Sequence, residues 1–148
     1  MLGMFDGQLA RLAADPDLPV IAYMHAMGMT GFTAYGGILH IGQLKDGEQV
    51  CVSTAAGAVG SIAAQIAKIK GCYVVGSTGS ADKAAWLKDE VGLDAVINYK
   101  ETPIRKALEE ATPKGIDVYF DNVGGDHLEA ALRRINTLGR IPVCGFIS

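Results

Sequence analysis

Beyond residue 49, short apolar runs alternate along the chain with stretches in which apolar residues recur every three or four positions. The runs predict strands, and the longer spacing predicts helices. The predicted strands cover residues 49–52, 72–77, 94–98, 116–121 and 140–146. The predicted helices cover residues 61–70, 81–90, 103–111 and 126–136. This alternation predicts an α/β fold with a doubly wound parallel sheet in the order 3-2-1-4-5.

Boundary signals accompany several of these helices. Ser80 and Asp126 precede helical stretches and can cap their free N–H groups. Pro103 suits the first position of the helix that ends near Ala111. Val59, Ile62, Ile66 and Ile69 recur at helical spacing in the first helix, and Leu128, Leu132 and Ile135 are expected to face inward in the last.

The chain before residue 49 gives fewer signals. Residues 1–17 are expected to form a tail, in which residues 8–14 could form a helical turn that Asp15 and Pro16 stop. Residues 20–44 are apolar and rich in glycine and methionine. Their spacing predicts a helix that begins near Thr30 or Thr33 and ends before Gly42, with Thr30 as a candidate N-cap.

A turn of small residues joins the first predicted strand to the first helix. It reads Ala55-x-Gly57-x-x-Gly60, which is the G-x-G-x-x-G pattern with alanine at the first position. In that pattern the second glycine lets the backbone approach a pyrophosphate closely, and the third lets the helix pack on the strand. Together with the following helix N-terminus, the segment Gly57, Ala58, Val59 and Gly60 predicts a dinucleotide phosphate site. Small residues at such a turn are common in α/β proteins, so the turn alone is weak evidence.

Composition narrows the class of protein. A chain of 148 residues is long enough for one α/β domain with a core and too short for two. The formal charge of −3 shows no basic face, which argues against nucleic acid as a partner. No apolar run is long enough to span a bilayer, so no membrane contact is expected.

The cysteines bear on compartment and metal content. Cys51, Cys72 and Cys144 each lie in an apolar run and are interpreted as buried free thiols in a reducing, cytoplasmic compartment. The chain has no C-x-x-C pair and no histidine near a cysteine at metal spacing. No metal site is therefore expected.

The end of the second strand indicates which dinucleotide is bound. NAD-binding sheets place an acidic residue there to hold the ribose 2′-hydroxyl, but this chain has Gly76 and Ser77. The residues that follow offer hydroxyl donors and a cation instead: Ser77, Thr78, Ser80 and Lys83. Such groups suit a phosphate monoester, which favours NADP(H) over NAD(H). The alternative is that neither residue binds a ligand: Ser80 only caps a helix, and Lys83 is only a solvated side chain.

Polar or small residues also follow the other strands. Tyr99 could stack on or hydrogen-bond the adenosine half of the cofactor, although it could equally be a surface ring. Asn122 and Gly124 are expected to face the ribose and nicotinamide half, although Asn-x-Gly-Gly could equally be a simple turn. A further segment is expected to border the nicotinamide: Cys144, Gly145 and Phe146.

The chain contains several short motifs in a particular order. Their joint occurrence is far more specific than any single motif. They are residues 28–35 (GMTGFTAY), 55–61 (AAGAVGS), 65–68 (QIAK), 70–72 (KGC), 98–100 (NYK), 119–125 (YFDNVGG), 139–141 (GRI) and 144–145 (CG). With them the chain resembles the nucleotide-binding half of a medium-chain dehydrogenase/reductase. It is most similar to the zinc-independent branch of prostaglandin reductases, leukotriene B4 12-hydroxydehydrogenases and alkenal double-bond reductases.

This resemblance implies roles for named residues. The turn from Gly57 to Gly60 would lie under the pyrophosphate, and Lys83 and Tyr99 would hold the 2′-phosphate end. Asn122 and the segment from Cys144 onward would lie along the cofactor toward the nicotinamide. These roles agree with the positions inferred from the strand ends.

The resemblance also implies a domain organisation. Family members carry a catalytic β-domain before this region and a sixth strand after it. Residues 1–17 are therefore interpreted as a tail left from the link to a catalytic domain that is absent here. Residues 18–148 are interpreted as an NADP-binding Rossmann domain truncated before a sixth strand.

The activity that the resemblance implies is an oxidoreductase reaction on a small enone or alkenal. Hydride would pass from NADPH to the C=C bond of an α,β-unsaturated aldehyde or ketone, with the cofactor carrying the chemistry. No residue is assigned as catalytic, the chain alone is expected to be inactive, and the expected protein partner is a second copy of itself. The alternatives are a quinone oxidoreductase of the same superfamily and a stand-alone NADP-binding module without turnover.

Overall fold

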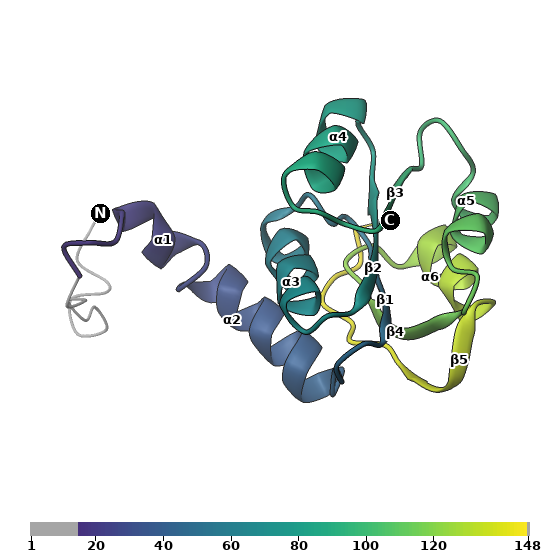
Figure 1. The fold of residues 1–148 in the computed structure, drawn as a ribbon, viewed down its shortest axis with the longest axis horizontal. Helices are drawn as coiled ribbons and strands as arrows, with labels where there is room; N and C mark the ends of the chain where they lie inside the picture. The colour runs from purple at the N-terminus through teal and green to yellow at the C-terminus, as the bar shows by residue number, and fades with distance from the viewer. Residues whose placement is uncertain (1–14, 148) are drawn as a thin grey trace, which may run out of the picture.

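The computed structural model describes residues 15–147, and the helical turn expected at residues 8–14 lies outside them. Its core is one sheet of five parallel strands in the order β3-β2-β1-β4-β5 (Figure 1). The strands are β1 (Gln49–Val52), β2 (Tyr73–Thr78), β3 (Ala95–Asn98), β4 (Ile116–Phe120) and β5 (Ile135–Arg140). The predicted fold class and strand order are confirmed.

Helices cover both faces of this sheet (Figure 1). On one face lie α3 (Ala58–Ile69) and α4 (Ala81–Asp89), and on the other lie α5 (Ile104–Ala111) and α6 (Gly125–Leu132). Successive strand residues point to opposite faces, so Val50 and Val52 pack on the α3 side whereas Cys51 packs on the α5 and α6 side. Burial on both faces explains why the strands read as continuous apolar runs.

The first long helix, α3, packs Val59, Ile62 and Ile66 against the core, but its fully buried residues are others. Its buried residues are small: Gly60, Ser61, Ala63, Ala64 and Ala67. Ile62 and Ile66 are only half-buried, and Ile69 is 85% exposed. Small side chains let a helix approach a sheet closely, and Ala63, Ala64 and Ala67 share one buried cluster with Val50, Val52 and Val74 of β1 and β2. The helix also begins at Ala58, three residues before the expected start.

The last helix and the last strand have different bounds from those predicted. The last helix stops at Leu132 rather than near residue 136, and Ile135 begins β5 instead of closing the helix. The run at 140–146, expected to be the fifth strand, makes only an isolated bridge between Asp121 and Val143 after Arg140. Pairing starts early because the Ile116 N–H, at the start of β4, donates to the Arg134 carbonyl at 2.9 Å.

Of the helix starts predicted at Ser80, Pro103 and Asp126, the structure confirms the first. The Ser80 hydroxyl does accept from the Lys83 N–H, at 3.3 Å, so this cap is confirmed. Pro103 occupies the N-cap position of α5 rather than its first helical position. Gly124, whose φ is +75°, occupies the N-cap of α6, and Asp126 lies inside the first turn without capping it.

Three short helices precede the sheet; the first extends away from the domain, and the other two pack against it (Figure 1). They are α1 (Val20–Met24), α2 (Met29–Tyr35) and the π-helix η1 (Gly36–Ile41). The predicted helix over this region is therefore present, but it begins at Met29 with Gly28 as N-cap. Thr30 does not cap it, because its hydroxyl donates to the His25 carbonyl at 2.7 Å. Within residues 15–147, no helix combines the length and apolarity needed to cross a membrane.

Candidate functional site

The turn after β1 is held against β2 by backbone and hydroxyl contacts. The Ala55 N–H donates to the Ser77 carbonyl at 2.8 Å, and the Thr54 N–H lies 3.4 Å from the Ser77 hydroxyl. Ser77 itself is 1% exposed, so this predicted site residue supports the turn from below. Gly57 closes the turn by donating its N–H to the Thr54 carbonyl at 2.9 Å.

Glycine at position 60 is required by packing. A Cβ built there would collide with the backbone of Thr54 and Ala55, so only glycine lets α3 start this close to the turn. Gly57, the N-cap of α3, provides no side-chain cap. The first N–H groups of α3 therefore point outward without a helical partner, and the helix dipole favours an anion in front of them.

A hollow of about 220 Å³ opens beside this turn, at the carboxyl ends of the strands. It is lined by Thr54, Ala56, Gly57, Thr78, Gly79, Ser80, Lys83 and Tyr99. The structure thus brings together Gly57, Lys83 and Tyr99, which the sequence analysis had singled out. No acidic residue lines this hollow, and Lys83 supplies its charge. Lys83 takes part in no ion pair within residues 15–147.

The predicted site residues and the residues that line this hollow differ in part. Ala58 is exposed and Val59 half-buried in the first turn of α3, and neither lines it. Thr54, Ala56 and Gly79 line it but were not proposed as site residues. Thr54 and Ala56 could have been found, because they lie inside the glycine-containing turn that gave the signal.

Tyr99 forms one wall of the hollow. Its N–H donates to the Thr78 carbonyl at 3.1 Å, which fixes the end of β3 against the end of β2. Its ring meets the His127 ring edge-on, with centroids 4.9 Å apart and planes at 83°. The Lys100 Nζ lies 5.7 Å from the centroid of the same ring.

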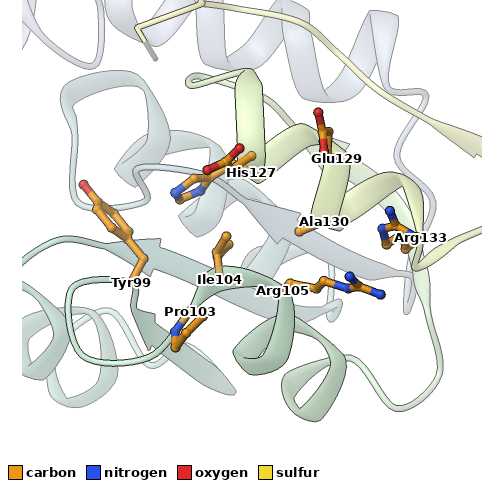
Figure 2. A pocket seen from close by; sticks show the side chains of 9 residues that line it. Tyr99, Pro103, Ile104, Arg105, His127, Glu129, Ala130 and Arg133 are labelled. Carbon is orange, nitrogen blue, oxygen red and sulfur yellow. The ribbon is translucent and has the colours of Figure 1, made fainter.

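A larger hollow of about 450 Å³ lies on the other side of Tyr99, between α5 and α6 (Figure 2). Arg105 and Arg133 lie at its far end from Tyr99 (Figure 2). Asp126 and Glu129 line it as well, so its charges are mixed and it has no glycine turn. Although it is larger, its lining suits a phosphate less well than the hollow beside Gly57.

A buried polar cluster joins the ends of β1 and β4. The Asp121 carboxylate is fully buried, and its Oδ1 accepts from the Val123 and Gly124 N–H groups, both at 3.0 Å. The Tyr119 hydroxyl lies 3.2 Å and the Ser53 hydroxyl 3.3 Å from the same oxygen. Burial, with smaller contributions from charges including Asp121, raises the pKa of Tyr119. Sequence reasoning assigned no role to Ser53 or Asp121.

Asn122 is anchored to the same strand end. Its backbone N–H donates to the Ser53 hydroxyl and its side-chain amide to the Ser53 carbonyl, both at 2.7 Å. One amide N–H is thus committed to the scaffold. The side chain is half-buried, and its orientation is therefore fixed rather than adaptable.

The segment expected to border the nicotinamide lies beside this cluster. The Cys144 and Gly145 N–H groups approach the Asp121 carbonyl at 2.7 and 3.2 Å. The Phe146 ring packs over Gly124, where a side chain would collide with it. The structure thus brings Asn122, Gly124 and residues 144–146 together. Cys144 is half-buried, unlike Cys51 and Cys72, so the prediction of three buried thiols is wrong for this one.

Within residues 15–147, no group of three histidine, cysteine or acidic side chains is arranged to hold a metal ion. The expectation that the chain carries no metal stays a prediction.

Comparison with known proteins places this architecture in a family. The family model described as zinc-binding dehydrogenase matches residues 58–148, which is more than half of the chain. Prostaglandin reductase 1 of Bos taurus is 52% identical over 139 residues, covering 93% of this chain and 42% of the relative. The NADP(+)-dependent 2-alkenal reductase of Nicotiana tabacum is 49% identical over 135 residues, covering 90% of this chain and 39% of the relative.

A solved structure gives the same result. CurA from Vibrio vulnificus, in complex with NADPH, superposes with a TM-score of 0.87 at 44% identity. The match covers 95% of this chain and 41% of that one, so the chain spans about two fifths of the length of such relatives. The chain belongs to the zinc-binding dehydrogenase family, in the prostaglandin and alkenal reductase branch of the medium-chain dehydrogenase/reductase superfamily, and corresponds to the Rossmann-type domain of its relatives.

Proposed function

We propose that this chain binds NADP(H) along the carboxyl ends of β1, β2 and β4. The observation that carries the proposal is the lining of the 220 Å³ hollow, where Gly57, Lys83 and Tyr99 surround one space without an acidic residue. The pyrophosphate would lie against the N-terminus of α3, where unpaired N–H groups and the helix dipole favour an anion. The 2′-phosphate would lie between Lys83 and Tyr99.

The nicotinamide half would extend toward the cluster at the end of β4. Asn122, Gly124 and residues 144–146 lie together there, and Ser53 and Asp121 hold them in place. Rigid backbone held by buried hydrogen bonds suits a site that must orient a reactive ring. A relative with the same fold is in complex with NADPH, which supports this choice of cofactor.

For the protein to which this domain belongs, we propose reduction of the C=C bond of an α,β-unsaturated aldehyde or ketone. NADPH supplies the hydride to the β-carbon, and a proton reaches the α-carbon. The residues of this chain bind and orient the cofactor, and none of them is assigned as a proton donor. Names of relatives such as 2-alkenal reductase support this substrate class. A cytoplasmic location and a homo-oligomeric state are further parts of the proposal.

The binding proposal is tested by titrating the chain with NADPH and NADH and following the heat released or the cofactor fluorescence. We expect NADPH to bind at least about tenfold more tightly, the scale of one charge-assisted contact. Equal affinities would contradict the assignment of the 2′-phosphate site.

The activity proposal is tested separately, by incubating the chain with NADPH and a short alkenal and, in parallel, a quinone. We expect no NADPH oxidation with either, because the chain spans only about two fifths of its relatives. Turnover of the alkenal would show that this chain holds a complete active site. Turnover of the quinone alone would favour the quinone oxidoreductase alternative.

A further inference from the structure

Tyr99 is the only residue that lines both hollows of this edge of the described chain, and its ring separates them. Three neighbours surround the ring: Gly79 at its hydroxyl, His127 at an edge-on contact, and Lys100 over its face. In Figure 2 the His127 ring extends from α6 toward Tyr99. The direction of the phenol is therefore set by contacts from the end of β2, from α6 and from the next residue in the chain.

Gly79 leaves the space that the Tyr99 hydroxyl uses. A Cβ built at Gly79 would lie 2.6 Å from the hydroxyl oxygen and 2.8 Å from Cζ of Tyr99. The φ of Gly79 is not in the left-handed region, so alanine is acceptable to its backbone. The side chain of alanine would therefore act on Tyr99 by pushing the phenol away from the end of β2.

His127 contacts the Tyr99 ring from α6. It lies in the first turn of α6 and is half-buried. Burial lowers its pKa, and the nearby Asp121 and Asp126 only partly oppose that shift. The imidazole is therefore mainly neutral at pH 7, and its contact with Tyr99 is an aromatic edge-to-face contact rather than an ionic one.

We propose that His127 and Gly79 are positioning residues that direct the Tyr99 hydroxyl into the hollow beside Lys83, and that they thereby set the preference for a 2′-phosphate over a 2′-hydroxyl. The inference rests on the NADP(H) site proposed above. His127 lines only the larger hollow, so it can act on the 2′-phosphate site only through Tyr99, whereas Gly79 lines the smaller hollow and also leaves the space that the Tyr99 hydroxyl uses. Because a phenol O–H donates well to phosphate oxygens, its direction changes affinity for NADPH and leaves that for NADH nearly constant.

The role of His127 is tested in the full chain with His127→Ala and His127→Phe, each with and without Tyr99→Phe. Dissociation constants are measured for NADPH, NADH and 2′,5′-ADP. We expect His127→Ala to weaken NADPH and 2′,5′-ADP about 3- to 10-fold, the range of an aromatic pair, and NADH less than twofold. His127→Phe should restore binding, because it returns an aromatic ring to the same place.

The double substitution shows whether His127 acts through Tyr99. When Tyr99 is already phenylalanine, no hydroxyl remains to be directed, so His127→Ala should then change NADPH affinity less than twofold. An equal loss in both backgrounds, or an equal loss for NADPH and NADH, would overturn the positioning role and leave a purely structural one. A wild-type chain without preference for NADPH would overturn the proposed cofactor site itself, and this inference with it.

Gly79→Ala provides the second variant, with Gly36→Ala as its matched control. A Cβ at Gly36 would meet nothing within 4 Å, so that substitution adds the same methyl group without a collision. We expect Gly79→Ala to weaken NADPH about 3- to 10-fold while NADH changes little, and Gly36→Ala to change neither. Unchanged NADPH affinity in Gly79→Ala, or an equal loss when Tyr99 is already phenylalanine, would overturn the part assigned to Gly79, and thermal unfolding verifies that the variants fold.

Discussion

At the scale of single residues, the ends of β1 and β4 show how a buried charge can serve a binding loop. One oxygen of Asp121 accepts two backbone N–H groups, from Val123 and Gly124, and lies near two hydroxyls. Hydrogen bonds of this kind compensate for removing that oxygen from water, whereas the other carboxylate oxygen, Oδ2, is buried without a partner among the described residues. The loop that follows β4 is thus pinned from inside the protein, and its outer surface is left for a ligand.

Lys83 allows the 2′-phosphate assignment to be tested by a single substitution. Lys83→Ala should weaken NADPH by about 1–3 kcal/mol, toward the lower end because the side chain is exposed and screened by solvent. NADH affinity should hardly change, since NADH has no 2′-phosphate. The measurement is a calorimetric titration with each cofactor. Lys88→Ala, on the same helix but away from the hollow, is the control. If both cofactors lose affinity together, Lys83 has only a structural role.

The thiols are expected to differ in reactivity. Burial raises the pKa of Cys51 to about 12, with Asp121 adding to the shift. At pH 8 only about one molecule in ten thousand then carries the thiolate that reacts. Cys144 is half-buried and its pKa is raised by burial as well, so it should react slowly but before Cys51.

Alkylation with iodoacetamide at pH 8, followed by mass spectrometry of peptides, measures this order. We expect Cys144 to be labelled first, and saturating NADPH to slow its labelling, because residues 144–146 are proposed to border the nicotinamide. Labelling of Cys144 that is indifferent to NADPH would remove it from the proposed site. Faster labelling of Cys51 than of Cys144 would contradict the burial described here.

At the scale of elements, the sequence predicted the type and order of the strands and the α3–α6 helices, but not which residues of a helix are fully buried or where β5 begins. Apolar spacing identified α3, yet its small residues are fully buried whereas Ile62 and Ile66 pack on the core only half-buried. Spacing reports that a helix is amphipathic, whereas close packing depends on side-chain volume across the interface. Ile135 was assigned to a helix because its actual partner, Ile116, is far away in sequence.

For the candidate site, the sequence indicated which residues gather at one edge of the sheet, and their role in binding the cofactor stays a prediction. Gly57, Lys83 and Tyr99 follow strand ends, and parallel strands bring their carboxyl ends to one edge, so local patterns were sufficient. His127 and Gly79 act through contacts with Tyr99 that span many residues. Contacts of this kind require the tertiary structure, and no pattern of neighbours in the sequence indicates them.

The junction of β1 and α3 makes a prediction about stability. Gly60→Ala would place a methyl group against the backbone of Thr54 and Ala55, which cannot move without opening the turn. We expect a loss of about 1–3 kcal/mol in the free energy of unfolding, the usual cost of overpacking. Urea denaturation measures it, with Gly36→Ala as a control that should be neutral or slightly stabilising. A neutral Gly60→Ala would show that the turn is not tightly packed.

At the scale of the whole molecule, the segment that leads into the sheet is unusually apolar. Residues 18–44 contain no lysine, arginine, aspartate or glutamate. Several large side chains along α1 and α2 are exposed: Val20, Ile21, Met24, Met29 and Phe32, at 65–82%. The first of these helices extends from the body of the domain, whereas α2 packs against α3 with Gly31 and Ala34 buried and leaves the apolar side chains of its other face exposed (Figure 1). Apolar surface of this extent is rarely left in contact with water.

We therefore expect the chain, as given, to self-associate at micromolar concentrations through this segment. Light scattering after size exclusion measures its mass, and Met29→Ser with Phe32→Ser should shift it toward the monomer, because both side chains are nearly fully exposed and support no core. Ile69→Ser, which removes an equally exposed apolar side chain from α3, should leave the mass unchanged. A wild-type chain that elutes as a monomer would show that these helices do not associate with a second copy. A variant of positions 29 and 32 that stays associated would place the contact elsewhere on the surface.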